Sequence, residues 1–223
     1  MKKYPRFEEY KVLTYRILLA YVFYSIARIL FYLYNHSLIN VDGIVDLLRL
    51  CYHGLVFDTT AILYVNSLFI IVSIFPTVIN VRKGYQKMLF YIYFITNLLA
   101  YSANYIDFIY YRYTFSRSTR ASLDTLENES NKTLLLLDFL KNYWHVFLLF
   151  FIMAFLWIWL YKKVKIVADS ARPNIQYFFF SVVSFLLIVT LCIGGIRGDF
   201  KKSTRPINIL DASRYTKNSG QAD

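Results

Sequence analysis

The sequence predicts an all-α integral membrane protein, a bundle of five transmembrane helices with interfacial amphipathic helices on its outer face. Five apolar stretches each approach the ~20 residues that a helix needs to cross the hydrocarbon layer, and they cover residues 12–34, 55–79, 88–111, 144–161 and 177–196. Charged residues, 17% of the chain, gather in short clusters between these stretches. Residues 1–196 are therefore the predicted transmembrane domain, and residues 197–223 an extracytoplasmic tail or linker.

The formal net charge of +11 would indicate nucleic acid as a partner if the protein were soluble. In a membrane protein the commoner cause is anchoring at anionic headgroups. The chain has no basic patch with interleaved stacking aromatic residues, so we expect no nucleic-acid partner. Membrane lipids, anionic phospholipid among them, are the expected partners.

Tyrosine is abundant, with 21 Tyr and 20 Phe against 3 Trp. A tyrosine ring favours the headgroup boundary, where its hydroxyl stays in water. Many tyrosines lie near the predicted helix ends, and we interpret them as an interfacial belt: Tyr32, Tyr34, Tyr52, Tyr91, Tyr93, Tyr110, Tyr111, Tyr113, Tyr143 and Tyr161.

Positive residues are densest before the first span, between the second and third spans, and between the fourth and fifth. These three regions share one side of the membrane if every predicted span crosses it. The positive-inside rule then predicts a cytoplasmic amino end. Five crossings place the carboxyl end outside.

Two outer connections carry helical patterns. Val41–Tyr52 spaces its apolar residues for a helix lying in the interface. In the second connection, Arg112–Tyr143, Ser118 or Thr119 is positioned to cap a short helix through Glu127. Asn131 or Thr133 is positioned to start another helix that runs into the fourth span. Helix ends are also predicted: Pro76 kinks or loosens the last turn of the second span, and Gly194-Gly195 closes the fifth.

Ionisable residues within a span usually face the bundle interior, a cavity or a partner. Arg28 lies well inside the first span, and Asp58 lies near the outer end of the second. A structural ion pair between the two is one interpretation. The alternative makes Arg28 a cation that binds a lipid headgroup.

The third span has a polar stripe formed by Asn97, Tyr101, Asn104, Asp107 and Tyr111. Hydrogen bonds between helices explain such a stripe, and a lipid or substrate groove is the competing interpretation. Asn66 in the second span is a further intramembrane polar candidate. His145 is interpreted as a residue of the membrane interface rather than a proton relay.

No catalytic motif is recognisable in these residues. Cys51, Cys192 and the three histidines are scattered, without the spacing of a metal site. No phosphate loop or nucleophile elbow is present in the sequence. We therefore predict no catalytic residue, no metal ligand and no cofactor in this chain.

Several short motifs resemble the membrane portion of the lipoteichoic acid synthase and sulfatase-like phosphotransferase family, within the alkaline phosphatase superfamily. Asn104–Leu126 (NYIDFIYYRYTFSRSTRASLDTL) is similar to that family's exit from its third helix. Phe57-Asp58 is similar to a recurrent "FD" pair. Gly195-Ile196-Arg197-Gly198, followed by Arg205-Pro206-Ile207, resembles the "RGG…RPI" exit from the fifth helix, with Asp199 in place of the second glycine.

The resemblance implies a role in transferring phosphoglycerol or a related group from a lipid donor. In the family the reaction uses a metal-activated Thr or Ser of an outer domain, so the divalent metal is expected only in that domain, which this chain lacks. The chain is then a fragment, or a truncated protein that assists a separate enzyme. Arg112, Arg117, Arg197 and Arg205 would meet lipid phosphates at the outer face, or serve as ordinary interfacial anchors.

The expected function is that of a membrane anchor and lipid-facing domain for such an enzyme in the bacterial cytoplasmic membrane. It would hold an extracytoplasmic catalytic domain, in cis or in trans, close to lipid-linked substrates of the cell envelope. Two alternatives remain open: a stand-alone small lipid or solute transporter, and a structural partner in a membrane assembly.

Overall fold

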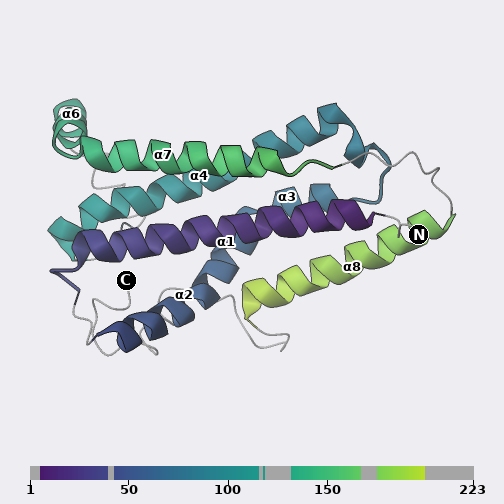
Figure 1. Cartoon of the computed structure of the whole chain (residues 1–223), viewed down its shortest axis with the longest axis horizontal. Helices are drawn as coiled ribbons and strands as arrows, with labels where there is room; N and C mark the ends of the chain where they lie inside the picture. Colours follow the sequence, from purple (N-terminus) through teal and green to yellow (C-terminus); the bar gives the residue numbers. More distant parts are fainter. Residues whose placement is uncertain (1–5, 40–42, 116–117, 119–131, 167–174, 199–223) are drawn as a thin grey trace. The chain divides into compact units, whose positions relative to one another are not determined.

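All regular structure in the described part of the chain is helical. The computed structural model describes residues 6–39, 43–115, 118, 132–166 and 175–198. Its helices are α1 (Phe7–Asn35), α2 (Ile44–Val65), α3 (Ser67–Ile74), the 3-10 helix η1 (Ile79–Val81), α4 (Lys83–Thr114), α6 (Lys132–Asn142), α7 (Trp144–Lys163) and α8 (Ile175–Arg197) (Figure 1). The predicted all-α class is confirmed for these residues.

Three of these helices are long and apolar enough to cross a membrane: Phe7–Asn35, Trp144–Lys163 and Tyr177–Arg197. Helices α2 and α3 also qualify when taken together, although the chain bends by 61° between them. The predicted third span lies wholly within α4, where Asn97, Asn104 and Asp107 lower the hydropathy. The described part thus has three candidate spans, or four if the bent pair is one span.

Some helix boundaries differ from those predicted. From Ile44 onward, the expected interfacial segment belongs to α2, which continues without a break into the second predicted span. Helix α2 continues through Gly54, because a glycine weakens a helix without necessarily ending it. The chain bends at Asn66 instead. Helix α8 continues through Gly194-Gly195, so the expected end there is wrong; the left-handed conformation of Gly198 (φ +79°) follows its last residue.

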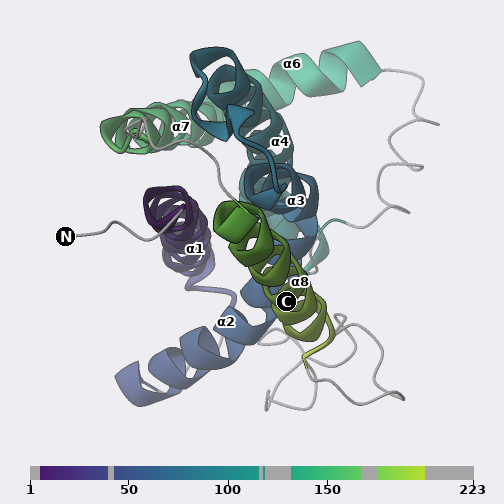
Figure 2. The same cartoon turned by 90° about the vertical axis from the view of Figure 1, so that its right-hand side faces the viewer.

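Other boundaries agree with the prediction. Helix α3 ends at Ile74, two residues before Pro76, because proline disfavours helical conformation in the residue that precedes it. Helix α6 begins at Lys132, between the two predicted starts. It ends at Asn142 and its axis turns away from that of α7 (Figures 1 and 2), so the prediction that this helix runs into the fourth span is wrong. Apart from Ser118, the predicted short helix through Glu127 lies outside the described residues.

The chain divides into two compact units. Unit 1 comprises residues 1–22, 55–98 and 159–207, and unit 2 comprises residues 23–54, 99–158 and 208–223. In unit 1, the buried Tyr93 ring lies 4.9 Å from the ring centroid of Phe69 and 5.0 Å from that of Tyr161. Helix α3 packs against α8 in the same unit (Figure 2). A Cβ on Gly195 of α8 would lie 2.4 Å from Leu63 Cδ1 of α2, so a small residue permits this approach.

Unit 2 has an aromatic interior of its own. Phe23 stacks on Trp157 with ring centroids 4.6 Å apart, and Tyr101 contacts Trp157 edge-on at 5.2 Å. Tyr111 is also buried here. The interpretation of the tyrosines as an interfacial belt is therefore wrong for Tyr93, Tyr111 and Tyr161, whose rings fill interiors.

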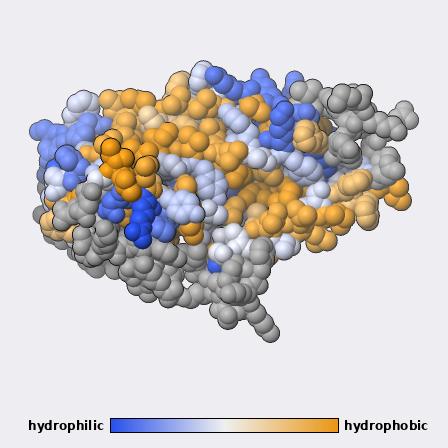
Figure 3. Space-filling model, turned by 60° about the horizontal axis from the view of Figure 1, so that its bottom comes forward, coloured by the Kyte–Doolittle hydropathy of each residue, from blue (hydrophilic) through white to orange (hydrophobic). Residues whose placement is uncertain are grey.

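Large apolar side chains cover much of the surface. Helix α8 is the clearest case, since only 11% of its most apolar 18-residue stretch is buried. Figure 3 shows broad apolar areas on the face that it displays. Such surfaces are compatible with a protein embedded in a membrane, where lipid chains solvate them.

Candidate functional site

The bend between α2 and α3 is closed by a pair of buried carboxamides in unit 1. Asn66 Nδ2 donates to Asn97 Oδ1 at 3.1 Å, and Asn97 Nδ2 donates to Asn66 Oδ1 at 2.7 Å. Asn66 also donates to the Ile62 carbonyl of α2, and Asn97 donates to the Tyr93 carbonyl of α4. Both side chains are fully buried. Two predicted polar candidates are thus brought together as a tie between helices.

A cluster of polar aromatic and basic side chains gathers in unit 2 at the ends of two candidate spans. The Tyr34 hydroxyl and His145 Nε2 lie 3.1 Å apart, where α1 ends and α7 begins. The Arg112 guanidinium, in the last turn of α4, lies 5.2 Å from the centroid of the Tyr34 ring. The Tyr113 and Tyr143 hydroxyls share a short hydrogen bond. We call these five residues the Tyr34 cluster.

The electrostatics of the Tyr34 cluster favour neutral phenols beside a cation. The hydrogen bond to Tyr113 raises the pKa of Tyr143 to about 12, and the nearby Arg112 lowers it by a smaller amount. Arg112 itself is exposed. Within the described part of the chain its guanidinium donates no hydrogen bond, so its N–H groups face the surroundings.

Arg28 lies against α2 within unit 2. Its Nη1 donates to the Cys51 carbonyl at 3.4 Å. The guanidinium occupies the space beside Gly54, where an added Cβ would lie 1.2 Å from Arg28 Nη1. Gly54 thus provides the room for Arg28. Asp58 is buried in α2 and belongs to unit 1, so its pairing with Arg28 stays a prediction.

Two of the remaining candidates, Asn104 and Asp107, form hydrogen bonds that the structure describes. Asn104 donates to the Ala100 carbonyl of its own helix at 3.4 Å. The buried Asp107 carboxylate accepts hydrogen bonds from the backbone N–H and the hydroxyl of Ser118, at 2.9 and 2.5 Å. Arg197 is the last residue of α8. Arg117 and Arg205 lie outside the described residues.

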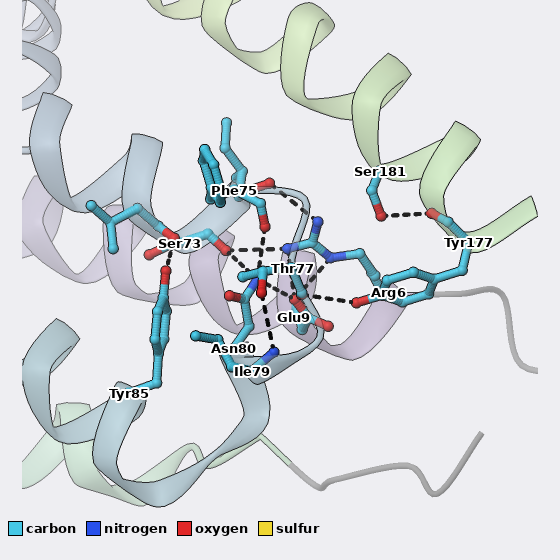
Figure 4. Close-up of polar contacts among 12 residues, drawn as sticks. Arg6, Glu9, Ser73, Phe75, Thr77, Ile79, Asn80, Tyr85, Tyr177 and Ser181 are labelled. Atoms are coloured by element: carbon cyan, nitrogen blue, oxygen red, sulfur yellow. Dashed lines mark hydrogen bonds and ion pairs between the residues drawn. The ribbon is translucent and has the colours of Figure 1, made fainter. Parts of the chain in front are cut away.

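A polar network at the end of α3 was missed by sequence reasoning (Figure 4). Arg6 donates to the carbonyls of Ser73 and Ile74, at 3.4 and 3.2 Å, and forms an ion pair with Glu9 at 2.8 Å. Asn80 Nδ2 donates to the Glu9 carboxylate and to the Ser73 carbonyl, at 3.1 and 3.3 Å. These side chains satisfy carbonyl groups that the interruption before Pro76 leaves without helical partners.

Further hydroxyl groups complete this network. Tyr85 donates to the Val72 carbonyl at 2.7 Å, and Tyr177 of α8 donates to the Thr77 carbonyl at 3.2 Å. Next to it, Arg16 lies 4.2 Å from the Tyr161 ring centroid and donates twice to Gln86 Oε1. A cavity of about 10 Å³, the space of a single water molecule, is lined by residues that include Arg16 and Asn80.

Arg6 and Arg16 belong to the basic amino end from which the sequence predicts a cytoplasmic orientation, yet only 6% and 5% of their surfaces are exposed. The available signals were the spacing of Arg6 and Glu9 by one helical turn, and the presence of Pro76, which requires other donors for the carbonyl groups before it.

Comparison with known proteins identifies no relative. No protein-family model matches the chain, and neither a curated protein nor a solved structure matches it.

Proposed function

We propose that this chain is the five-crossing membrane domain of a bacterial cytoplasmic membrane protein, with its amino end inside and its carboxyl end outside. The three candidate spans and the bent α2–α3 pair supply four crossings. Helix α4 supplies the fifth, because its 32 residues, at about 1.5 Å each, extend about 48 Å. Helix α6, at the outer end in this topology, is then an interfacial helix.

The proposed function is to anchor a sulfatase-like phosphotransferase and to present lipid-linked envelope substrates to it. The observation that carries this proposal is the use of buried polar residues as ties within the helical scaffold, as in the Asn66–Asn97 pair. A rigid scaffold suits an anchor. The phosphotransferase assignment is supported by the resemblance of the segments that surround Asn104 and Arg197.

The mechanism is positional. A catalytic domain joined to the outer end, in cis beyond Asp223 or as a separate protein, would be confined within reach of the membrane surface. Its effective substrate concentration rises because the encounter becomes local. The divalent metal and the nucleophile belong to that domain.

The alternative of a small transporter is favoured by one observation, the 61° bend at Asn66. Broken helices near the middle of the membrane are a feature of transporters, where they form the substrate site. Here the polar groups at the bend bond to each other, which favours the anchor.

The two functions are separated by a pair of assays. In membranes that contain the chain, we expect transfer of labelled phosphoglycerol from phosphatidylglycerol, and its loss when the chain is deleted. Purified chain in sealed vesicles should move neither lipid nor solute. If the vesicles showed lipid or solute flux, and deletion of the chain left phosphoglycerol transfer unchanged, the transporter function would replace the anchoring function.

A further inference from the structure

The Tyr34 cluster carries an inference that deepens the proposed function and rests on its membrane placement. We infer that Tyr34, Arg112, Tyr113, Tyr143 and His145 bind the phosphodiester headgroup of a membrane lipid. The side chains come from α1, α4 and α7, with Tyr143 in the turn between α6 and α7. Three helices and a turn thus converge on one site.

The cation of this site is held in place while its donors remain available. The ring of Tyr34 lies 5.2 Å from the Arg112 guanidinium, a cation–π arrangement that orients it without using its N–H groups. Among the described residues none accepts a hydrogen bond from those groups. A planar guanidinium with free donors matches two oxygens of a phosphate.

The neighbouring groups complete the chemistry expected for an anion. One hydrogen-bonded pair joins Tyr34 to His145, and another joins Tyr113 to Tyr143. Each pair shares one hydrogen bond, so one O–H or N–H of each pair is left to donate to a phosphate oxygen. The amino end of α7, which begins at Trp144, adds the positive end of a helix dipole. None of the five residues of the cluster is a carboxylate.

The location identifies the phosphate as that of a lipid. Tyr34 occupies the last turn of one candidate span, and His145 the first turn of another. A span begins and ends at the level of the headgroups, where tyrosine rings are favoured. Large apolar side chains nearby, including Leu33, Trp144 and Leu148, are exposed and would contact the acyl region.

The test measures lipid binding to the purified full chain in detergent, with short-chain phosphatidylglycerol as the probe and native mass spectrometry as the readout. We expect Arg112→Gln to weaken binding about tenfold, the scale of a lost charge-assisted hydrogen bond. Arg112→Lys keeps the positive charge but loses the paired N–H donors of the guanidinium. Its lipid affinity should lie between those of the wild type and Arg112→Gln. Arg82→Gln is the matched control, because Arg82 is also exposed and immediately precedes the other end of α4.

Two further arms identify the ligand. Diacylglycerol, which has no phosphate, should bind at least tenfold more weakly than phosphatidylglycerol. Inorganic phosphate should displace the lipid only at far higher concentration, whereas displacement at equal concentration would mean a soluble anion and overturn the lipid assignment. The thermal unfolding midpoint of each variant checks folding, and Tyr34→Phe provides a second variant that keeps the ring.

Equal binding by the wild type, Arg112→Gln and Arg82→Gln would overturn the inference. Because this assay uses the chain alone, its failure leaves the anchoring function standing. Conversely, loss of the anchoring function in membranes would not change lipid binding by the purified chain.

Discussion

Asn66 and Asn97 exchange hydrogen bonds through their side-chain amides, at 3.1 and 2.7 Å, across the point where α2 gives way to α3. Both amides donate their second N–H to the backbone carbonyl four residues earlier, at Ile62 and Tyr93. In a lipid environment an unpaired amide cannot form a hydrogen bond with water instead. The pair therefore ties the broken helix to α4 in unit 1.

We expect Asn66→Leu to lower the free energy of unfolding by about 1–2 kcal/mol, because it leaves the Asn97 amide buried and half-satisfied. The double variant with Asn97→Leu should lose less than the sum of the single losses, by about 0.6–1.7 kcal/mol. Unfolding in mixed detergent micelles measures this cycle. Strictly additive losses would show that the two amides are not coupled.

Gly54→Ala should destabilise the wild type, although alanine favours a helix over glycine by about 1 kcal/mol. The cause is the Arg28 guanidinium, which occupies the place of the new methyl group. In an Arg28→Ala background the same change should stabilise. Gly84→Ala is the control, since no heavy atom lies within 4 Å of its added Cβ. The thermal unfolding midpoint in detergent measures these effects. If Gly54→Ala destabilised the protein in both backgrounds, Arg28 would not be the cause.

Asn80→Leu should cost about 2 kcal/mol of the free energy of unfolding. It removes the donor that serves the Glu9 carboxylate and the carbonyls of Ser73 and Phe75. Asn142→Leu, at an exposed position at the end of α6, should be close to neutral. The same detergent unfolding assay compares them. Equal effects at the two positions would mean that the network around Arg6 adds no stability.

The Tyr113–Tyr143 hydrogen bond predicts a pH dependence. With a folded pKa of about 12 for Tyr143, against about 10 for a free phenol, its contribution to stability is complete below pH 10 and is lost as the pH rises through 12. The tyrosinate absorbance of the wild type minus that of Tyr143→Phe should titrate near pH 12. Tyr113→Phe should return that midpoint to about 10, and an unchanged midpoint would exclude the hydrogen bond as its cause.

Single polar residues could be selected from the sequence, but their partners could not. Asn66 and Asn97 were both recognisable as costly inside apolar segments. The helical period shows that residues share a face, but it does not identify the neighbouring helix. For the same reason the sequence could offer Asp58 or a lipid headgroup as the partner of Arg28, but it could not show that Arg28 lies beside Gly54. His145 was recognised as a boundary residue without its link to Tyr34.

The sequence by itself determined the helical class, the apolar segments and the interruption at Pro76, because hydrophobicity and proline geometry act locally along the chain. Tertiary structure decided which charges and tyrosines are buried, as Arg6, Arg16 and Tyr93 demonstrate. It also assembled the Tyr34 cluster from residues over a hundred positions apart in the chain. The physical reason is that hydrogen bonds and ring contacts between helices depend on which helix faces pack together. The sequence of one helix does not specify which other helix it packs against.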